Sequence, residues 1–203
     1  MIRKVFSAIV AIFIFTVVSA QMDSKAKFIL DKTLEVYKQS SGVSISFTGS
    51  HDGRLLLDHK KFVLETSDVI SWFDGETLWT YVKSSEEVNV SNPSEDELKA
   101  INPYELLGMY RHGFNYSYNG NKKMKGNTVD MVTLYPADNS TSIKSIALSI
   151  NSKYQATEIK MTDMHQNSQH FIVEEYKTHI SYDDSTFKFD SKKYPEAEII
   201  DLR

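Results

Sequence analysis

The sequence has no cysteine among its 203 residues, and this absence excludes several kinds of structure. No disulfide can cross-link the fold, and no zinc site with thiolate ligands can form. A bacterial lipoprotein carries a cysteine at its cleavage point, so a lipid anchor of that kind is excluded as well. Stability must therefore come from packing, for which eleven tyrosines, eleven phenylalanines and two tryptophans are well suited.

The first twenty residues have the pattern of a cleavable signal peptide. Arg3 and Lys4 form a short basic region, an apolar run covers residues 5–18, and small residues precede Gln21. The run is short for a permanent membrane-spanning helix, although an uncleaved anchor stays the alternative. We expect export to the periplasm by the Sec route, cleavage near Ala20, and one monomeric domain over residues 21–203.

An excess of positive charge is also missing. The chain has 23 Lys and Arg against 27 Asp and Glu, and removal of the signal peptide leaves 21 basic residues and a net charge of −6. Nucleic acids and anionic membrane surfaces both select basic patches. The sequence therefore argues against binding to either.

Catalytic motifs are absent too. The sequence contains no His-Glu-x-x-His, no Gly-x-Ser-x-Gly and no Gly-rich phosphate or dinucleotide loop. His165 and His170 lie five residues apart around an expected turn, a weak arrangement for a metal. Paired acids such as Glu174 and Glu175 are adjacent in extended segments, so their side chains point to opposite faces. We expect no enzyme activity, no metal and no cofactor; a lipid hydrolase is the least supported alternative.

The hydrophobic pattern predicts a helix followed by a long series of strands. Apolar residues recur at helical spacing over 23–40, with Asp23 as a cap and Gly42 as a terminator. The period then changes to two, and Asp-Gly pairs at 52–53 and 74–75 indicate hairpins. The expected strands cover 43–48, 54–58, 62–64, 69–73, 76–82, 87–91, 114–118, 129–135, 143–151, 154–162 and 169–177.

A helical interruption is expected between these strands. Ser94 and Glu97 have capping-box spacing, and Asn102-Pro103 can start a second helix, giving helices near 94–101 and 103–110. Residues 121–127 are expected to form a basic loop. The fold class is therefore mainly β with helices (α+β): an open antiparallel half-barrel of about 11 strands, covered by an N-terminal helix and a central helical lid.

Two segments are more specific than this general pattern: 61–65 (Lys-Phe-Val-Leu-Glu) and 72–81 (Trp-Phe-Asp-Gly-Glu-Thr-Leu-Trp-Thr-Tyr). They resemble the periplasmic outer-membrane lipoprotein carrier family, LolA, whose members have a Phe-containing strand and then an Asp-Gly hairpin leading into a Leu-Trp-x-Tyr strand. Residues 102–107 are similar to the family's central helix, 132–136 to its x-Leu-x-Pro strand, and 146–171 to its final hairpins.

The resemblance implies an eleven-stranded open barrel and a chaperone that performs no chemistry. Such a carrier receives acylated lipoproteins from an inner-membrane ABC lipoprotein-releasing transporter and delivers them to an outer-membrane acceptor; the sequence identifies neither the acceptor nor the lipid. One departure concerns the Arg-Pro pair before the Phe strand, whose Arg latches the lid. Asp58 and His59 occupy those places here, and Arg54 is the nearest substitute.

Alternation along the strands supplies the candidate lipid-binding residues, because every second side chain of a curved sheet faces its hollow. The strands contribute Ile45, Phe47, Leu55, Leu57, Phe62, Leu64, Ile70, Trp72, Trp79, Tyr81, Ile146, Leu148, Ile150 and Met161. The lid contributes Leu98, Ile101, Leu106, Leu107 and Met109. Ordinary core packing is the open alternative, and a register error of one residue would invert a facing. The alternative function is a lipid-sensing or scaffold protein on the same half-barrel that binds a protein partner.

Overall fold

A computed structural model of the chain describes residues 23–94, 97–98, 108–138 and 141–203. These residues form one long α-helix, two short 3-10 helices and twelve strands. The bounds in chain order are α1 Ser24–Gln39, β1 Val43–Gly49, β2 Gly53–Asp58, β3 Lys61–Thr66, β4 Val69–Phe73, β5 Leu78–Val82, β6 Glu87–Ser91, η1 Met109–Arg111, β7 Phe114–Met124, β8 Asn127–Pro136, β9 Ile143–Asn151, β10 Ala156–Asp163, β11 Ser168–Thr178, η2 Asp184–Phe187 and β12 Glu198–Asp201.

The N-terminal helix begins where the sequence predicts. The Asp23 carboxylate accepts the backbone N–H groups of Lys25 at 2.9 Å and Ala26 at 3.0 Å, which satisfies donors that a helix start leaves free. The role predicted for Gly42 is wrong. The helix ends at Gln39, and Gly42 begins the approach to β1 instead, where an added Cβ would lie 2.1 Å from the Ile180 carbonyl oxygen.

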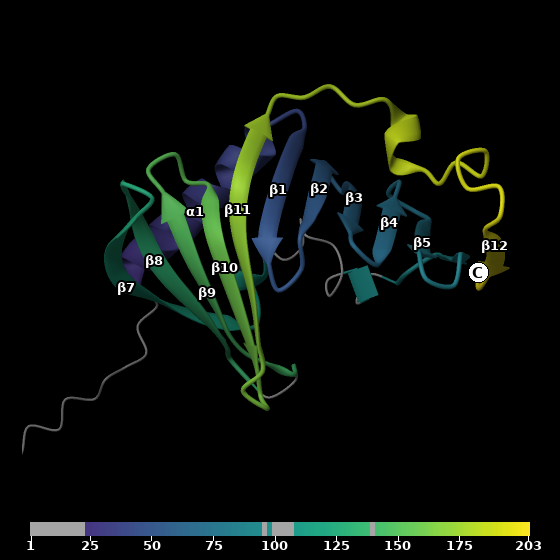
Figure 1. The fold of residues 1–203 in the computed structure, drawn as a ribbon. Helices are drawn as coiled ribbons and strands as arrows, with labels where there is room; N and C mark the ends of the chain where they lie inside the picture. The colour runs from purple at the N-terminus through teal and green to yellow at the C-terminus, as the bar shows by residue number, and fades with distance from the viewer. Residues whose placement is uncertain (1–22, 95–96, 99–107, 139–140) are drawn as a thin grey trace, which may run out of the picture.

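All twelve strands belong to one open sheet, in the order β12-β6-β5-β4-β3-β2-β1-β11-β10-β9-β8-β7. Pairing of β1 with β11 joins a first half, β2 to β6, to a second half, β7 to β10. These neighbours pair antiparallel, which confirms the open half-barrel (Figure 1). The twelfth strand was not foreseen: β12 pairs parallel with the edge strand β6.

One predicted loop is a hairpin. Residues 121–127 continue β7 to Met124 and enter β8 at Asn127, which pair with each other across Lys125 and Gly126. Both turn residues have positive φ, 47° and 82°, as a two-residue hairpin turn requires. Of the lysines that indicate a loop in the sequence, Lys122 and Lys123 are therefore strand residues and Lys125 is a turn residue.

The two faces of the sheet are covered by different segments (Figure 1). We call the face against which α1 packs the inner face; Ala26, Ile29 and Leu30 are buried there against β7, β8 and β9. The opposite, outer face of β3 and β4 is covered by residues 179–197, the C-terminal segment, whose Phe187 is fully buried. Within the described residues, no helix combines the length and the apolar character needed to cross a membrane.

Candidate functional site: the inner face of the open sheet

The inner face of β1, β2 and β3 collects six of the predicted lining residues. Ladder pairs run across the three strands from Ile45 to Leu55 to Leu64. Paired residues of neighbouring strands point to the same side of a sheet, so each row forms a continuous apolar band. The six residues on this face are Ile45, Phe47, Leu55, Leu57, Phe62 and Leu64.

Phe47 extends this band towards the end of the strands because glycine faces it. Gly53 is its ladder partner on β2, and a Cβ on Gly53 would lie 2.6 Å from the Phe47 ring. On the other side, Phe47 meets Phe171 of β11 edge to face, with ring centroids 5.7 Å apart. The glycine thus leaves the space that the aromatic ring fills.

Four more predicted lining residues share the inner face in the second half of the sheet. Met161 of β10 pairs with Ile146 of β9, and Leu148 and Ile150 follow at alternate positions of the same strand. They pack in the cluster that contains the apolar side of α1. The end of the helix also reaches the first half of the sheet, where Tyr37 is buried with Val43, Leu57 and Phe62.

Burial divides these ten residues into two groups. Leu57 and Phe62 are each 2% exposed, and Ile146 and Ile150 are also buried, so these four are core residues. Six remain half-buried although they are apolar and belong to the same face, and we call them the apolar strip: Ile45, Phe47, Leu55, Leu64, Leu148 and Met161.

The facing predicted for Ile70, Trp72, Trp79 and Tyr81 is wrong. The two-residue turn between β3 and β4 pairs Phe62 with Phe73 and Val63 with Trp72, so Trp72 points away from Phe62. All four residues belong to the outer-face cluster around Phe187. The alternation within each strand does not fix the facing of one strand relative to the next; the parity of the turn does, and here it puts Phe62 and Trp72 on opposite faces.

Two further residues lie on the inner face but are not among the predicted lining residues. Phe73 is buried beside Phe62, with ring centroids 5.6 Å apart, and counting across the turn at residues 67–68 would have found it. Tyr176 of β11 pairs with Ile45 and packs against the same cluster. Burial in these apolar surroundings raises the pKa of Tyr176 to about 12.

The central lid is described only in part. Ser94 and Glu97 form the predicted capping box: the Glu97 carboxylate accepts the Ser94 N–H at 2.8 Å, and the Ser94 hydroxyl oxygen accepts the Glu97 N–H at 3.4 Å. Leu98 packs against the inner-face cluster of Phe62 and Phe73. Ile101, Leu106 and Leu107 lie outside the described residues, as does the side chain of Met109.

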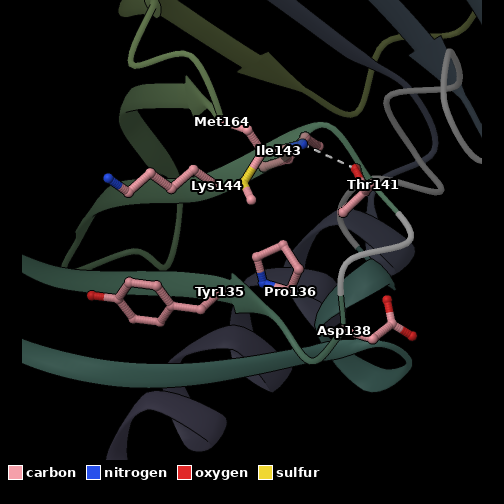
Figure 2. Close-up of a pocket in the computed structure, with 7 residues that line it drawn as sticks. All are labelled: Tyr135, Pro136, Asp138, Thr141, Ile143, Lys144 and Met164. Atoms are coloured by element: carbon pink, nitrogen blue, oxygen red, sulfur yellow. Dashed lines mark hydrogen bonds between the residues drawn. The ribbon is translucent and has the colours of Figure 1, made fainter.

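A small pocket of about 170 Å³ lies where β8 ends and β9 begins (Figure 2). Its wall includes Pro136 and Ile143, and its rim carries Tyr135 and Met164, both exposed. The Ile143 N–H donates to the Thr141 hydroxyl at 3.1 Å and shapes the loop beside it. The pocket is smaller than the roughly 300 Å³ of typical small-ligand sites, so we assign no ligand to it.

Among the described residues, no three His, Asp or Glu side chains lie together as metal ligands would. His170 instead contacts the Glu158 carboxylate at 2.7 Å, and Lys122 contacts it at 2.5 Å. This group on the outer face of β10 is an ion-pair network.

The comparison that decides the family is a match over most of the chain. The family model described as "Outer membrane lipoprotein carrier protein LolA" matches residues 16–165. The chain belongs to the LolA family. The match covers α1 and every strand from β1 to β10, and with them all the residues of the apolar strip. Among curated proteins, none matches the sequence.

Solved structures support the fold. An uncharacterized conserved protein from Thermus thermophilus is 12% identical, with a TM-score of 0.62, and the match covers 87% of this chain and 99% of that one. The lipoprotein LppX of Mycobacterium tuberculosis is 14% identical at a TM-score of 0.49, covering 79% and 98%. The MucA/MucB complex of Pseudomonas aeruginosa contains a chain that is 9% identical at a TM-score of 0.42, and the match covers 83% of this chain and 62% of that one. The first of these likenesses carries the comparison of folds.

Asp58 and His59, which stand where the LolA family has its Arg-Pro pair, contact each other and do not extend over the inner face. Asp58 bonds to the neighbouring His59 ring at 2.7 Å, in the turn between β2 and β3. Arg54 lies on the outer face, where its Nε donates to the Ser44 hydroxyl at 3.3 Å. Arg54 is therefore wrongly placed to substitute for the family's latch arginine.

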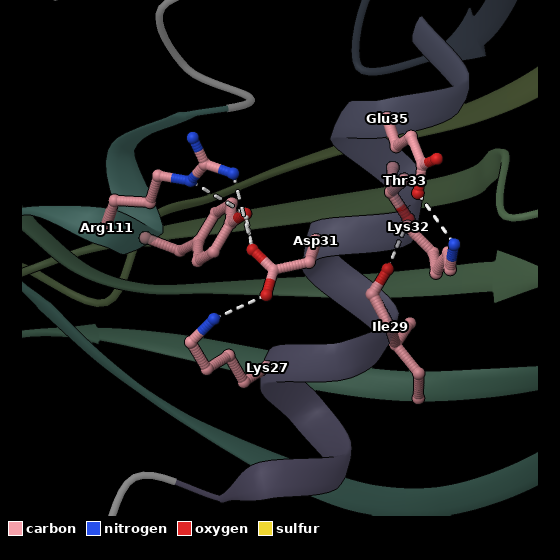
Figure 3. Close-up of polar contacts among 8 residues, drawn as sticks. Lys27, Ile29, Asp31, Lys32, Thr33, Glu35 and Arg111 are labelled. Atoms are coloured by element: carbon pink, nitrogen blue, oxygen red, sulfur yellow. Dashed lines mark hydrogen bonds and ion pairs between the residues drawn. The ribbon is translucent and has the colours of Figure 1, made fainter.

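A different set of contacts joins η1, which follows the central lid, to α1 (Figure 3). The buried Tyr110 hydroxyl donates to Asp31 at 2.6 Å, and the Arg111 Nε donates to that hydroxyl at 3.1 Å. Lys27, one turn before Asp31, contacts the other carboxylate oxygen at 2.5 Å. Burial, with the Asp31 bond, raises the pKa of Tyr110 to about 12, while Lys27 and Tyr110 lower the pKa of Asp31.

Proposed function

We propose that this protein is an exported carrier that holds the acyl chains of lipoproteins against the inner face of its sheet. It loses its signal peptide near Ala20, works in the periplasm as one domain over residues 21–203, and performs no chemistry. It receives acylated lipoproteins from an inner-membrane ABC transporter and releases them to an outer-membrane acceptor. The observation that carries the proposal is the LolA family match, which spans the whole apolar strip.

The physical support is an apolar surface that the protein covers only in part. An acyl chain of about sixteen carbons costs on the order of 12 kcal/mol to keep in water, at about 0.8 kcal/mol per CH₂. The half-buried side chains of the apolar strip offer contact without directional bonds, so a chain can slide along them. Met161 adds a flexible side chain that can repack around different cargo.

A matched pair of variants on one strand tests the proposal. Leu55 and Leu56 are adjacent and both half-buried, but Leu55 belongs to the inner-face cluster and Leu56 packs against the outer one. Protein purified from the periplasm is weighed by native mass spectrometry with its cargo. We expect acylated polypeptide on the wild type and on Leu56→Glu and little on Leu55→Glu, since a carboxylate on the inner face repels alkyl chains.

Equal cargo on Leu55→Glu and on Leu56→Glu would contradict the carrier function. Circular dichroism on both variants provides the control, because each must keep the wild-type spectrum for the comparison to count.

The second candidate is a sensor or scaffold that binds a protein partner on the same fold. Two features favour it: Arg54 cannot act as the LolA latch, and β11, β12 and the C-terminal segment lie beyond the family match. The same mass measurement separates the two. An inner face without lipid, together with a stoichiometric polypeptide that carries no acyl chain, supports the partner-binding protein.

A further inference from the structure

A cavity of about 580 Å³ lies on the outer face, between the sheet and the C-terminal segment. Val63, Ile70 and Trp72 of β3 and β4 line it from the sheet side, and Phe189 and Tyr194 line it from the C-terminal segment. The volume falls within the range of about 300–1,000 Å³ that is usual for small-ligand sites. The sheet separates this cavity from the apolar strip, so cargo on the inner face neither fills nor explains it.

Three aromatic rings form one wall of the cavity. The Trp72 ring lies 5.7 Å from Phe189 at 63° and 5.7 Å from Tyr194 at 68°, and Phe189 and Tyr194 stack at 5.6 Å. Rings this close contact one another and leave no gap for a cation between them, unlike an aromatic cage. Trp72 is 8% exposed and supports the two other rings from below, so the half-buried rings of Phe189 and Tyr194 supply most of the surface against which the apolar side of a ring-shaped ligand can pack.

Charged side chains around this wall are compensated one by one. Glu65 lies 3.7 Å from Lys83, outside the cavity. Asp190 and Lys193, which both line it, are 3.9 Å apart. The lining carries two carboxylates, Glu65 and Asp190, and two ammonium groups, Lys188 and Lys193, so neither sign of ligand charge is favoured.

The lining nevertheless contains many hydrogen-bonding groups of both kinds. Carboxylates of Glu65 and Asp190 accept, the ammonium groups of Lys188 and Lys193 donate, and the hydroxyl of Ser185 does both. Lys188 is itself balanced by Asp74, at 3.6 Å. A ligand that uses such a lining fully is uncharged and carries several hydroxyl groups, each of which donates and accepts.

The wall from the C-terminal segment is held in place before any ligand arrives. Phe187 is fully buried against the sheet, and the Lys61 ammonium contacts Asp184 at 2.5 Å. Upstream, the Tyr182 hydroxyl donates to the Val43 carbonyl at 3.2 Å. A fixed wall lowers the entropy that binding would otherwise cost.

We propose that this outer cavity binds a neutral saccharide, with one sugar ring against the Trp72, Phe189 and Tyr194 wall and its hydroxyls on the charged rim. The site is independent of the proposed cargo function, because it uses the opposite face of the sheet. It gives the carrier a second ligand, of polyhydroxylated and uncharged chemistry.

Tryptophan fluorescence gives a local signal for this site. The chain has two tryptophans, Trp72 and Trp79, and both belong to the outer-face cluster. The mature protein is titrated with maltose and with N-acetylglucosamine, and saturation-transfer NMR reports which sugar protons touch the protein. We expect a saturable emission change with at least one sugar and no comparable change with inorganic phosphate or choline.

Two neighbouring lysines provide the matched variants. Lys193 lines the cavity, while Lys192 is exposed beside it and does not. Lys193→Ala should weaken sugar binding about three- to tenfold, the value of one good hydrogen bond, and Lys192→Ala should leave it unchanged. Phe189→Ala should weaken it by about tenfold through the lost ring contact.

Three results would overturn the proposal: no saturable response to either sugar, an equal response to phosphate or choline, or the same loss in Lys192→Ala as in Lys193→Ala. Leu55→Glu separates this test from that of the carrier function. The variant should lose acyl cargo and keep the sugar response, so failure of one proposal leaves the other to be judged on its own result.

Discussion

The two faces of β3 show how one strand serves two environments. Phe62 and Leu64 point to the inner face, where apolar side chains continue from strand to strand and several stay half-buried. Val63 and Glu65 point to the outer face, where aromatic rings and charges meet the C-terminal segment. The alternation of a strand thus separates an apolar surface from a mixed polar and aromatic cavity within one residue.

A charged side chain in the buried part of the inner face should cause the largest loss of stability. Phe62 is 2% exposed, so Phe62→Glu should destabilise the protein by more than about 4 kcal/mol and leave most of it unfolded. Phe62→Leu is the control and should cost far less. Urea unfolding followed by circular dichroism measures both; a fully folded Phe62→Glu would show that this position is not core.

Loss of a buried side chain on the outer face should destabilise only the C-terminal segment and not the whole sheet. Phe187 is fully buried beneath the C-terminal segment, and Phe187→Ala should cost about 3–5 kcal/mol where that segment packs. We expect hydrogen exchange to rise over residues 179–197 while β9 and β10 keep their protection. A uniform rise over the whole sheet would mean that both faces unfold as one unit.

Acid should weaken the outer face of the second half. Burial alone would raise the pKa of Glu158, but hydrogen bonds from Lys122, Ser149 and His170 outweigh it and lower the pKa from 4.5 to about 2. A lowered pKa stabilises the folded state above pH 4.5, and this contribution is lost as the pH falls from about 4.5 to about 2. It amounts to about 3 kcal/mol as an upper bound.

Unfolding free energies of wild type and Glu158→Gln, measured against pH, test this directly. The variant should be less stable than wild type at pH 7, and the difference should shrink across that acid range. A difference that stays constant with pH would assign the cost to packing and not to charge.

The smallest expected effect concerns the tie between α1 and η1. Tyr110→Phe removes the hydroxyl that donates to Asp31 and should cost about 1 kcal/mol. Tyr135→Phe, at an exposed position on the pocket rim, should cost almost nothing. Denaturant midpoints measure both, and equal values would mean that the Tyr110 hydroxyl adds no stability.

Local signals in the sequence were enough for most elements of the fold. The Asp23 cap, the Asp74-Gly75 turn and the Ser94 capping box act between near neighbours, so their residues alone predict them. The LolA resemblance, now matched over residues 16–165, added the order in which the elements assemble.

Local signals did not predict which face of the sheet each side chain is on, nor the segment that covers the outer face. The direction of Trp72 depends on the parity of a two-residue turn, and an error of one residue inverts it. Phe187 and Tyr194 lie in a segment without strand or helix periodicity. Phe187 packs in the cluster of Val63, Ile70 and Trp72, and the Tyr194 ring contacts Trp72 and Tyr81, all of which are distant in sequence. The C-terminal segment and its cavity therefore became visible only in three dimensions.

The most direct test of the difference between the faces is photo-crosslinking from a matched aromatic pair. A benzophenone amino acid replaces either Phe47, half-buried on the inner face, or Tyr81, half-buried on the outer one, in cells that make acylated lipoproteins. We expect crosslinks to acylated lipoprotein from position 47 and none from position 81. Crosslinks from position 81 alone, or equally from both, would contradict an inner-face carrier.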